Sequence, residues 1–311
     1  MTEILLSVSG LSHRYAGRPA LTELSFALAR GETVGFLGQN GAGKSTTLAL
    51  IAGLMPIQQG RITLAGHDRT AAGRAANRTL GFLPDVPPLQ DDQRVEDFLR
   101  FAGALQGLKG QALSTALARE LERCQLGQVR RKLNASLSKG FRQRVGLAAA
   151  LLHQPPIVLL DEPSSGLDPV QQQEFRTLIR DLADHAAILL SSHQLDEVEA
   201  CCSRALVLHE GRLHADLPLA SLRAPSLLLA LREPPALERL AALPGVLDAQ
   251  ALPDGRFRLE LERRDPSLNQ AIAREAVSHG WGLLELTPGG SVLASTFLAV
   301  TQGQSQAEIP L

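Results

Sequence analysis

Short runs of consecutive apolar residues recur along the N-terminal part of the chain. Thr33–Leu37 lies between two glycines, Ile157–Leu160 ends at an acidic pair, and Ala186–Leu190 ends at Ser191-Ser192-His193. Such runs are typical of parallel strands that are buried on both faces of a sheet. The stretches between them carry apolar residues at three- and four-residue spacing, which predicts helices. These stretches are residues 44–54, 94–155 and 170–184.

Weaker apolar patches predict further strands around this core. Residues 3–9 and 24–28 are strand-like, and we expect a polar loop, His13–Tyr15, to separate them. Two short patches on either side of Glu210-Gly211 predict a hairpin. Because strands alternate with helices, the sequence predicts an α/β fold with a mostly parallel sheet.

The pattern changes near Arg223-Ala224-Pro225, where we place a domain boundary. After it the predicted order is strand, helix, strand, strand, helix, strand, as in a ferredoxin-like α+β unit. These elements are expected at residues 227–232, 235–242, 246–252, 255–262, 266–279 and 281–287, followed by a helix at about 291–300 and a polar tail at 302–306. The 311 residues therefore predict two domains, residues 1–222 and 223–311.

Composition and charge exclude several classes of protein. The 31 Lys and Arg residues are balanced by 32 Asp and Glu residues, so no global basic field would attract nucleic acid. Aromatic residues make up only 4%, too few for platforms that stack on single strands. We therefore expect no nucleic-acid partner. No apolar run approaches the roughly 20 residues of a spanning helix, and no secretory signal is visible at the N-terminus.

A glycine-rich loop follows the first apolar run. Gly38-Gln39-Asn40-Gly41-Ala42-Gly43-Lys44-Ser45 fits the phosphate-loop pattern G-x-x-x-x-G-K-[ST], and Thr46 continues into the predicted helix. Glycines let successive backbone N–H groups turn toward an anion, and the helix N-terminus adds its positive dipole end. We predict that Lys44 supplies a charge to the β- and γ-phosphates and that the Ser45 hydroxyl binds Mg²⁺. A glycine-rich turn with an accidental Lys-Ser is the simpler alternative, but it does not explain the flanking strand and helix.

Three polar residues follow the next two apolar runs. Asp161 and Glu162 end the run Ile157–Leu160, and His193 follows the run Ala186–Leu190. Ligands of parallel α/β sheets bind at the carboxyl ends of the strands, so we expect these side chains near the phosphate loop. We predict that Asp161 holds Mg²⁺ through water, that Glu162 is the general base for the attacking water, and that His193 senses the γ-phosphate.

One segment distinguishes this chain from other phosphate-loop proteins. Leu137-Ser138-Lys139-Gly140-Phe141 resembles the signature sequence of ABC transporter ATP-binding subunits, and it precedes the acidic strand as in that family. Ser165-Gly166-Leu167-Asp168-Pro169 resembles the family's D-loop, and Ser191-Ser192-His193 resembles its switch-histidine loop. Tyr15 matches the aromatic position that stacks on adenine. The resemblance covers about residues 3–222.

The resemblance implies a fold, a mechanism and partners. The family fold is a RecA-like P-loop ATPase core with an antiparallel β-subdomain and a helical subdomain, expected here at about residues 87–155. Two copies close head to tail around two ATP molecules, so that Ser138 and Gly140 of one copy meet the γ-phosphate bound by the other. Asp168 of the D-loop is expected to take part in ATP binding. A separate membrane permease would keep this subunit in the cytoplasm, at the inner face of the plasma membrane.

The chain departs from the family pattern at three places. Lys139 and Phe141 replace residues of the usual Leu-Ser-Gly-Gly-Gln; Lys at this position is familiar in the exporter-type branch, so we expect export. Asp85 stands where the family usually has Gln, and we predict that it reaches Mg²⁺ or the attacking water, with a water bridge because its side chain is shorter. The C-terminal region resembles the extension of exporter-type and gliding-associated subunits, but their acidic ending appears here only as Ser291-Val292-Leu293-Ala294-Ser295-Thr296-Phe297.

Two other functions fit part of the sequence. A non-transport ABC ATPase acting on ribosomes or DNA would share the motifs, although such proteins carry two ATPase domains or long insertions that this chain lacks. A small-molecule kinase would share the phosphate loop but would not explain the signature at Leu137–Phe141. The C-terminal domain is either a regulatory ligand-binding domain or an appendage that stabilises a dimer, and the appendage is the hypothesis that we favour.

Overall fold

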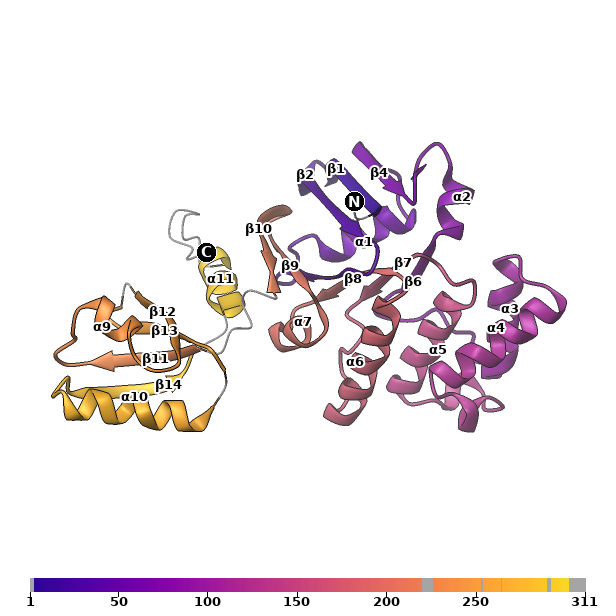
Figure 1. The fold of residues 1–311 in the computed structure, drawn as a ribbon. Coiled ribbons are helices and arrows are strands. Elements are labelled where there is room, and N and C mark those ends of the chain that lie inside the picture. The colour runs from indigo at the N-terminus through magenta and orange to yellow at the C-terminus, as the bar shows by residue number, and fades with distance from the viewer. Residues whose placement is uncertain (1–2, 220–225, 253, 264, 290–291, 302–311) are drawn as a thin grey trace. The chain divides into compact units, whose positions relative to one another are not determined.

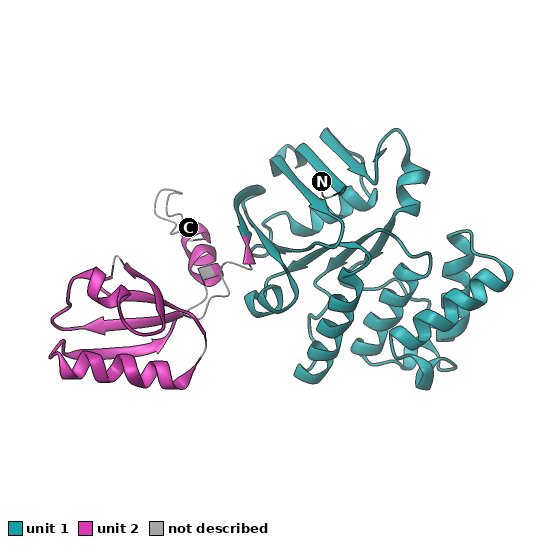
Figure 2. Ribbon diagram, viewed as in Figure 1, with its two compact units in different colours: residues 1–217 teal, residues 218–311 magenta. Residues whose placement is uncertain are grey.

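The chain divides into two units, which we describe separately. The computed structural model describes residues 3–219, 226–252, 254–263, 265–289 and 292–301 (Figure 1). Unit 1 comprises Met1–Leu217 and unit 2 comprises Pro218–Leu311 (Figure 2). The boundary predicted between residues 222 and 223 lies outside the described residues. Within the described ranges, no helix has both the length and the apolar composition needed to cross a membrane.

A six-stranded sheet forms the centre of unit 1 (Figure 1). In the order of the sheet, its strands are β10 (Arg212–Pro218), β9 (Arg204–His209), β3 (Thr33–Leu37), β8 (Ala187–Ser192), β7 (Ile157–Asp161) and β6 (Leu80–Leu83). Strands β9, β3, β8, β7 and β6 pair in parallel with one another, and every residue of β3, β7 and β8 is buried. The predicted α/β fold with a mostly parallel core is confirmed.

Several helices directly follow or precede these strands along the chain. Among them are α1 (Lys44–Ala52), α2 (Gly73–Arg78), α6 (Pro169–Ala183) and α7 (Leu195–Cys201). Helix α1 ends at Gly53, which has a left-handed φ of 72° and whose N–H caps the last turn. Helix α7 packs so closely on β3 that a Cβ at Gly35 would overlap Val198. This close packing fixes the loop between β8 and α7 relative to the sheet.

A second sheet of unit 1 is antiparallel, and it corrects one prediction. Its strand order is β2 (Arg18–Ala29), β1 (Ile4–Tyr15), β4 (Gln59–Leu64) and β5 (His67–Asp68). The expected polar loop His13–Tyr15 is wrong, because these residues complete β1 and pair with β2 as far as Tyr15 and Arg18. The chain reverses at Ala16 (φ 46°) and Gly17 (φ 81°), whose left-handed conformations suit a two-residue hairpin turn. Register shifts along β1 break the alternation of apolar residues, so the sequence shows two patches instead of one strand.

Three helices make up most of the region predicted to be helical at residues 87–155. They are α3 (Val95–Leu105), α4 (Gly110–Arg123) and α5 (Lys139–Leu151), with 3₁₀ turns at Gly127–Val129 and Asn134–Ser136. Their buried faces repeat at helical spacing, as in Val95, Phe98 and Leu99 of α3. Helix α5 continues from this group onto the central sheet, where it packs against β6.

Unit 2 contains an antiparallel sheet and helices in the predicted β-α-β-β-α-β order. The elements are β11 (Ser226–Leu231), α9 (Leu237–Ala241), β12 (Val246–Ala251), β13 (Phe257–Leu261), α10 (Pro266–Ser278) and β14 (Leu283–Pro288). The strand order is β12-β13-β11-β14, and Leu229, Leu259 and Trp281 belong to the apolar core. Helix α11 (Val292–Thr301) follows, while Ser291 and the predicted polar tail lie outside the described residues.

Candidate functional site

The glycine-rich loop joins β3 to α1. Gly41 (φ 86°) and Gly43 (φ 106°) adopt left-handed conformations that side chains disfavour. A Cβ at Gly38 would lie 2.8 Å from the carbonyl oxygen of Leu208. The backbone N–H and the hydroxyl of Thr47 both donate to the Gly43 carbonyl at 2.9 Å, which ties the loop to the first turn of α1. The sequence therefore folds into a tight loop that ends at a helix N-terminus, where an anion is stabilised.

This loop forms one wall of a cavity of about 540 Å³ in unit 1. The cavity brings together residues from six separate segments of the chain. Its lining comprises Tyr15, Ala20, Gln39, Asn40, Gly41, Gly43, Lys44, Ser45, Thr46, Asp85, Glu162, Ser165 and His193. Gly38 and Ala42, which belong to the same loop, are buried beneath it. Most of the residues that the sequence marks as nucleotide-binding or catalytic thus share one cavity.

The carboxyl group of Glu162 lies between a cation and an imidazole. Its Oε1 is 3.6 Å from the Lys44 Nζ, and its Oε2 is 2.6 Å from the His193 Nδ1. Lys44 also donates to the carbonyl oxygens of Gly38, at 2.7 Å, and Gln39, at 3.4 Å. Glu162 has a φ of 47°, and non-glycine residues in this region are strained and concentrate at functional sites. The strand end therefore holds this carboxylate in a defined position on the cavity wall.

Asp161 lies under the phosphate loop, at the end of β7. Its Oδ1 accepts hydrogen bonds from the hydroxyls of Ser191 at 2.6 Å and Ser45 at 3.3 Å. Burial raises the pKa of Asp161, the two hydroxyls lower it, and the nearby carboxylates of Glu162 and Asp85 raise it further. Hydroxyl and carboxylate oxygens are the ligands that Mg²⁺ prefers, and a cation would relieve the repulsion among the three carboxylates. The donor set of Ser45, Asp161 and Asp85 therefore fits Mg²⁺.

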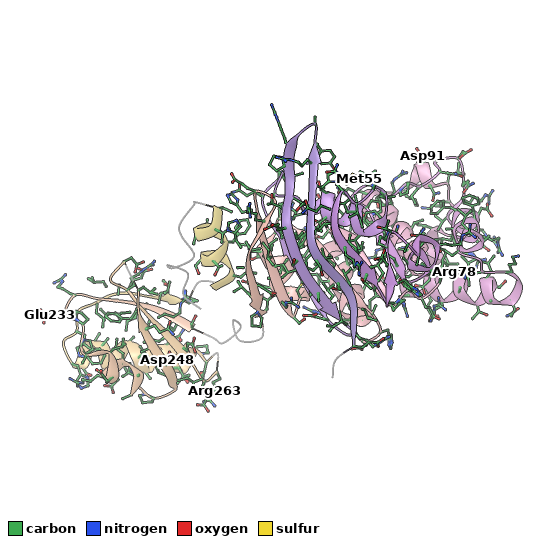
Figure 3. The ribbon with its side chains drawn as sticks, turned by 90° about the horizontal axis from the view of Figure 1, so that it is seen from above. Met55, Arg78, Asp91, Glu233, Asp248 and Arg263 are labelled. Atoms are coloured by element: carbon green, nitrogen blue, oxygen red, sulfur yellow. The ribbon has the colours of Figure 1, made fainter. Side chains whose placement is uncertain are left out.

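Tyr15 lines the same cavity from the end of β1. Its side chain is about half exposed, its hydroxyl lies 3.1 Å from the sulfur of Met55 (labelled in Figure 3), and its ring packs edge-on against His13. An aromatic ring that is fixed at one edge and open on one face offers a flat apolar surface to a planar ligand. The geometry is compatible with the predicted stacking on a base.

Three residues that the sequence marks as nucleotide-binding belong neither to this cavity nor to the phosphate loop. Ser138 accepts the N–H of Phe141 and caps α5, while Asp168 accepts the N–H of Gln171 and caps α6. A Cβ at Gly140 would lie 2.6 Å from the Gln171 side chain, so the two helices begin side by side. An ion pair between Arg144 and Glu174 joins them in the next turns. Ser138, Gly140 and Asp168 therefore form a second locus on the same unit.

The structure also adds residues that sequence reasoning missed. Ser165 lines the cavity, Ser191 holds Asp161, and the side-chain amide of Gln143 donates to the Asp85 carbonyl at 2.6 Å. The sequence does carry a signal for Ser191, because it follows an apolar run whose end, like the end of the run before Asp161, we expect at the carboxyl edge of the sheet. Gln143 has none, because it lies 58 residues from Asp85 and only folding brings the two together.

A strand, a phosphate loop and a helix, with a carboxylate at the end of a neighbouring parallel strand, define the class of P-loop nucleoside triphosphatases. Comparison with known proteins identifies the family within this class to which the chain is similar. The family described as "ABC transporter" matches residues 21–165. The ABC transporter ATP-binding protein YxlF of Bacillus subtilis is 36% identical over 209 residues, which are 67% of this chain and 69% of that protein.

Two further similarities extend this result. YdbJ, another Bacillus subtilis ABC transporter ATP-binding protein, is 28% identical over 313 residues, 99% of each chain, so the similarity includes unit 2. The solved structure of an ATP-binding subunit of an ABC transporter is 34% identical, with a TM-score of 0.65 over 70% of this chain and 92% of that chain. The chain belongs to the family of ABC transporter ATP-binding proteins, the subunits that bind and hydrolyse ATP.

Proposed function

We propose that this chain binds Mg²⁺ and ATP in the cavity of unit 1 and that its hydrolysis of ATP drives a separate membrane permease. The observation that carries the proposal is the position of Glu162, whose carboxyl group is held between Lys44 and His193 on the cavity wall. The resemblance of the signature sequence with Lys139 to the exporter-type branch supports export. Docking to a permease would keep the chain in the cytoplasm, at the inner face of the plasma membrane.

Each polar group at the strand ends has a part in this reaction. Glu162 accepts the proton of the attacking water, because its carboxylate lines the cavity beside Lys44, whereas Asp161 is held by hydroxyls beneath the loop. Its hydrogen bond to the His193 Nδ1 orients the imidazole, which can then contact the γ-phosphate through Nε2. Lys44 leaves the carbonyl oxygens of the loop for the β- and γ-phosphates, whose negative charge develops further as the bond breaks.

Ser45, Asp161 and Asp85 would hold the Mg²⁺ ion. When bound, the ion neutralises phosphate charge during transfer of the γ-phosphoryl group to water. The hydrogen bonds from Ser191 and Ser45 orient Asp161 toward the phosphate loop without any ion. Asp85 adds a negative charge where the family usually has a neutral Gln, so we expect tight binding of the cation by this chain.

The second locus, with Ser138, Gly140 and Asp168, supports a dimer. Ser138 caps the N-terminus of α5, where exposed N–H groups and the helix dipole favour a phosphate. Because this locus lies outside the cavity of its own chain, we propose that it contacts the ATP bound by a second copy. Size-exclusion chromatography tests this: Glu162→Gln should dimerise with ATP, and Glu162→Gln/Ser138→Arg should stay monomeric.

A groove of about 580 Å³ in unit 1 supports docking of a permease. It lies where α3 and α5 meet β6, and its lining includes Leu54, Val86 and Leu105, which are largely exposed. Apolar patches of this kind mark interaction surfaces. We propose that a short helix of the permease binds here. Leu105→Glu should release the chain from membranes without loss of basal ATP hydrolysis, whereas Ile4→Glu, an equally apolar exposed position outside the groove, should stay membrane-associated.

ATP hydrolysis by the purified chain tests the proposal as a whole. We expect phosphate release that depends on Mg²⁺ and on Glu162. Co-purification with ribosomes instead of membranes would support the alternative of a non-transport ABC ATPase. Transfer of phosphate to a small molecule, in place of water, would support a kinase.

A further inference from the structure

A buried carboxyl group lies directly behind the loop of His193. Glu197 belongs to α7, and only 1% of its surface is exposed. Fully buried carboxylates are rare because removing a charge from water costs free energy. Burial raises the pKa of Glu197, the hydroxyls of Ser164 and Ser192 lower it, and Glu162 raises and Arg176 lowers it through space. No step of the proposed reaction uses this group, so its burial calls for another explanation.

Glu197 fixes the residue that precedes His193. The Ser192 hydroxyl donates to the Glu197 Oε2 at 2.6 Å and accepts the backbone N–H of Gln194 at 3.0 Å. The loop is therefore held on both sides of His193. The His193 side chain itself is 48% exposed, so its packing alone does not position the ring. The hydrogen bonds of the loop set where the imidazole lies.

The same carboxyl group faces a second loop at the cavity. Ser164 lies between Glu162 and the cavity-lining Ser165, and it is buried next to Glu197. Among the residues that the structure describes, neither the Ser164 hydroxyl nor the Glu197 Oε1 has a partner with hydrogen-bond geometry. Buried polar atoms without partners are uncommon. Because the two side chains are neighbours, a hydrogen bond from the Ser164 hydroxyl to the Glu197 Oε1 would satisfy both atoms.

We propose that Glu197 is a positioning residue for ATP hydrolysis. Through Ser192 it holds His193 against Glu162, and through Ser164 it joins the loop after β7 to the loop after β8 when the site closes on nucleotide. This inference rests on the proposed function, because it gives Glu197 a part in the same reaction. A displacement of about 1 Å at a reacting group can cost about a hundredfold in rate, so loss of this anchor should be visible in kcat.

Three variants separate positioning from folding. Glu197→Leu keeps the volume and removes both acceptors, and we expect kcat to fall about 10- to 100-fold while the Kd for ATP changes less than about threefold. Glu197→Gln should retain most activity, because the amide oxygen still accepts the Ser192 hydroxyl. Ser192→Ala should reproduce the loss with a smaller disturbance of the core. Glu120→Leu is the matched control, since Glu120 is equally buried but lies on α4, and it should leave kcat within about twofold of wild type.

A double-mutant cycle tests whether Glu197 acts through His193. In a His193→Ala background, Glu197→Leu should cause no further loss in single-turnover hydrolysis, because groups that act as one unit are not additive. A full additional loss in that background would overturn the proposal. So would wild-type kcat in both Glu197→Leu and Ser192→Ala.

A measurement without ATP distinguishes failure of this inference from failure of the proposed function. The ¹H–¹⁵N signals of the His193 ring, assigned with His193→Ala, should shift in Glu197→Leu, return in Glu197→Gln and stay unchanged in Glu120→Leu. Unchanged His193 signals in Glu197→Leu and Ser192→Ala would contradict the inference. If the wild-type chain hydrolysed no ATP but the signals shifted as expected, the proposed function would fail while the anchoring of His193 stood.

Discussion

The two units bury different kinds of side chain. In unit 1, Lys44, Asp161, Ser191, Ser192 and Glu197 are all buried at the carboxyl ends of the central strands or in the elements that follow them. In the described part of unit 2, the buried polar side chains are Arg258 and Thr296, and the core is built from residues such as Leu229 and Leu259. Burying a polar group costs free energy unless it is hydrogen-bonded. Unit 1 buries polar groups elsewhere too, such as Glu120 on α4, but only those at this edge line or adjoin a cavity where a phosphate would compensate the cost.

The difference in buried side chains indicates which unit carries the reaction. The polar groups of unit 1 form a connected set, from Ser45 through Asp161 and Ser191, and from Lys44 through Glu162 to His193. Unit 2 shows an apolar core under a small antiparallel sheet. We infer that unit 1 carries the reaction and that unit 2 contributes mainly a folded surface.

Two buried cations give the sharpest test of this contrast. Lys44 and Arg258 are 6% and 9% exposed, one in each unit. Lys44→Met should lower kcat/KM about 100-fold or more, because it removes a charge aimed at the phosphates. Arg258→Met should leave kcat/KM within about twofold of wild type. Steady-state phosphate release measures both, and a comparable loss in the two variants would refute the division of roles.

A substitution that creates a cavity in the core of unit 2 should lower the stability of that unit alone. Leu229 is fully buried in β11, and Leu229→Ala should lower the free energy of unfolding of unit 2 by about 2–5 kcal/mol. Calorimetry should then show a transition that moves to lower temperature and a second one, assigned to unit 1 by its shift with ATP, that does not move. A single transition that shifts as a whole would show that the units unfold together.

Tyr15 tests the part of the cavity that lies outside the phosphate loop. Tyr15→Ala should raise the KM for ATP about tenfold, since stacking of a base on an aromatic ring contributes about 1–3 kcal/mol. Tyr15→Phe should change KM less than about twofold, because the hydroxyl is directed to the Met55 sulfur, which is a weak acceptor. Initial rates over a range of ATP concentrations give both values. An equal increase in the two variants would mean that the hydroxyl, and not the ring, is what matters.

The smallest effect is expected from removing unit 2. Deletion of residues 224–311 should leave basal kcat within about threefold of the full chain, because every residue that lines the cavity belongs to unit 1. Steady-state phosphate release by the shortened chain measures this kcat. Loss of folded, ATP-binding protein would contradict independent units.

The sequence predicted those parts of the fold in which the signal is local. The phosphate loop is a contiguous motif between a strand and a helix, and the strands before Asp161 and His193 are continuous apolar runs. The order of elements in unit 2 was also predictable, because its strands and helices have the lengths and spacing that their periodicity indicates. In each case neighbouring residues carry the information.

The parts that the sequence did not predict depend on contacts between distant segments. The bulges of β1 are set by its pairing with β2 and β4, so the end of this strand, His13–Tyr15, was predicted as a loop. Helix α7 spans Leu195–Cys201, too few residues to show helical periodicity, so the sequence analysis did not single out Glu197. The pairing of Arg144 with Glu174 joins residues 30 positions apart. Such contacts follow from tertiary packing, which no local pattern reports.

Substitution of Glu162 tests the central claim most directly. In Glu162→Gln the amide keeps the size of the side chain but cannot accept a proton at neutral pH, so we expect steady-state ATP hydrolysis to fall about 100-fold or more. Binding of ATP, measured by equilibrium titration on the same preparation, should stay within about threefold of wild type. Wild-type turnover by Glu162→Gln would contradict the assignment of the general base and, with it, the mechanism proposed here.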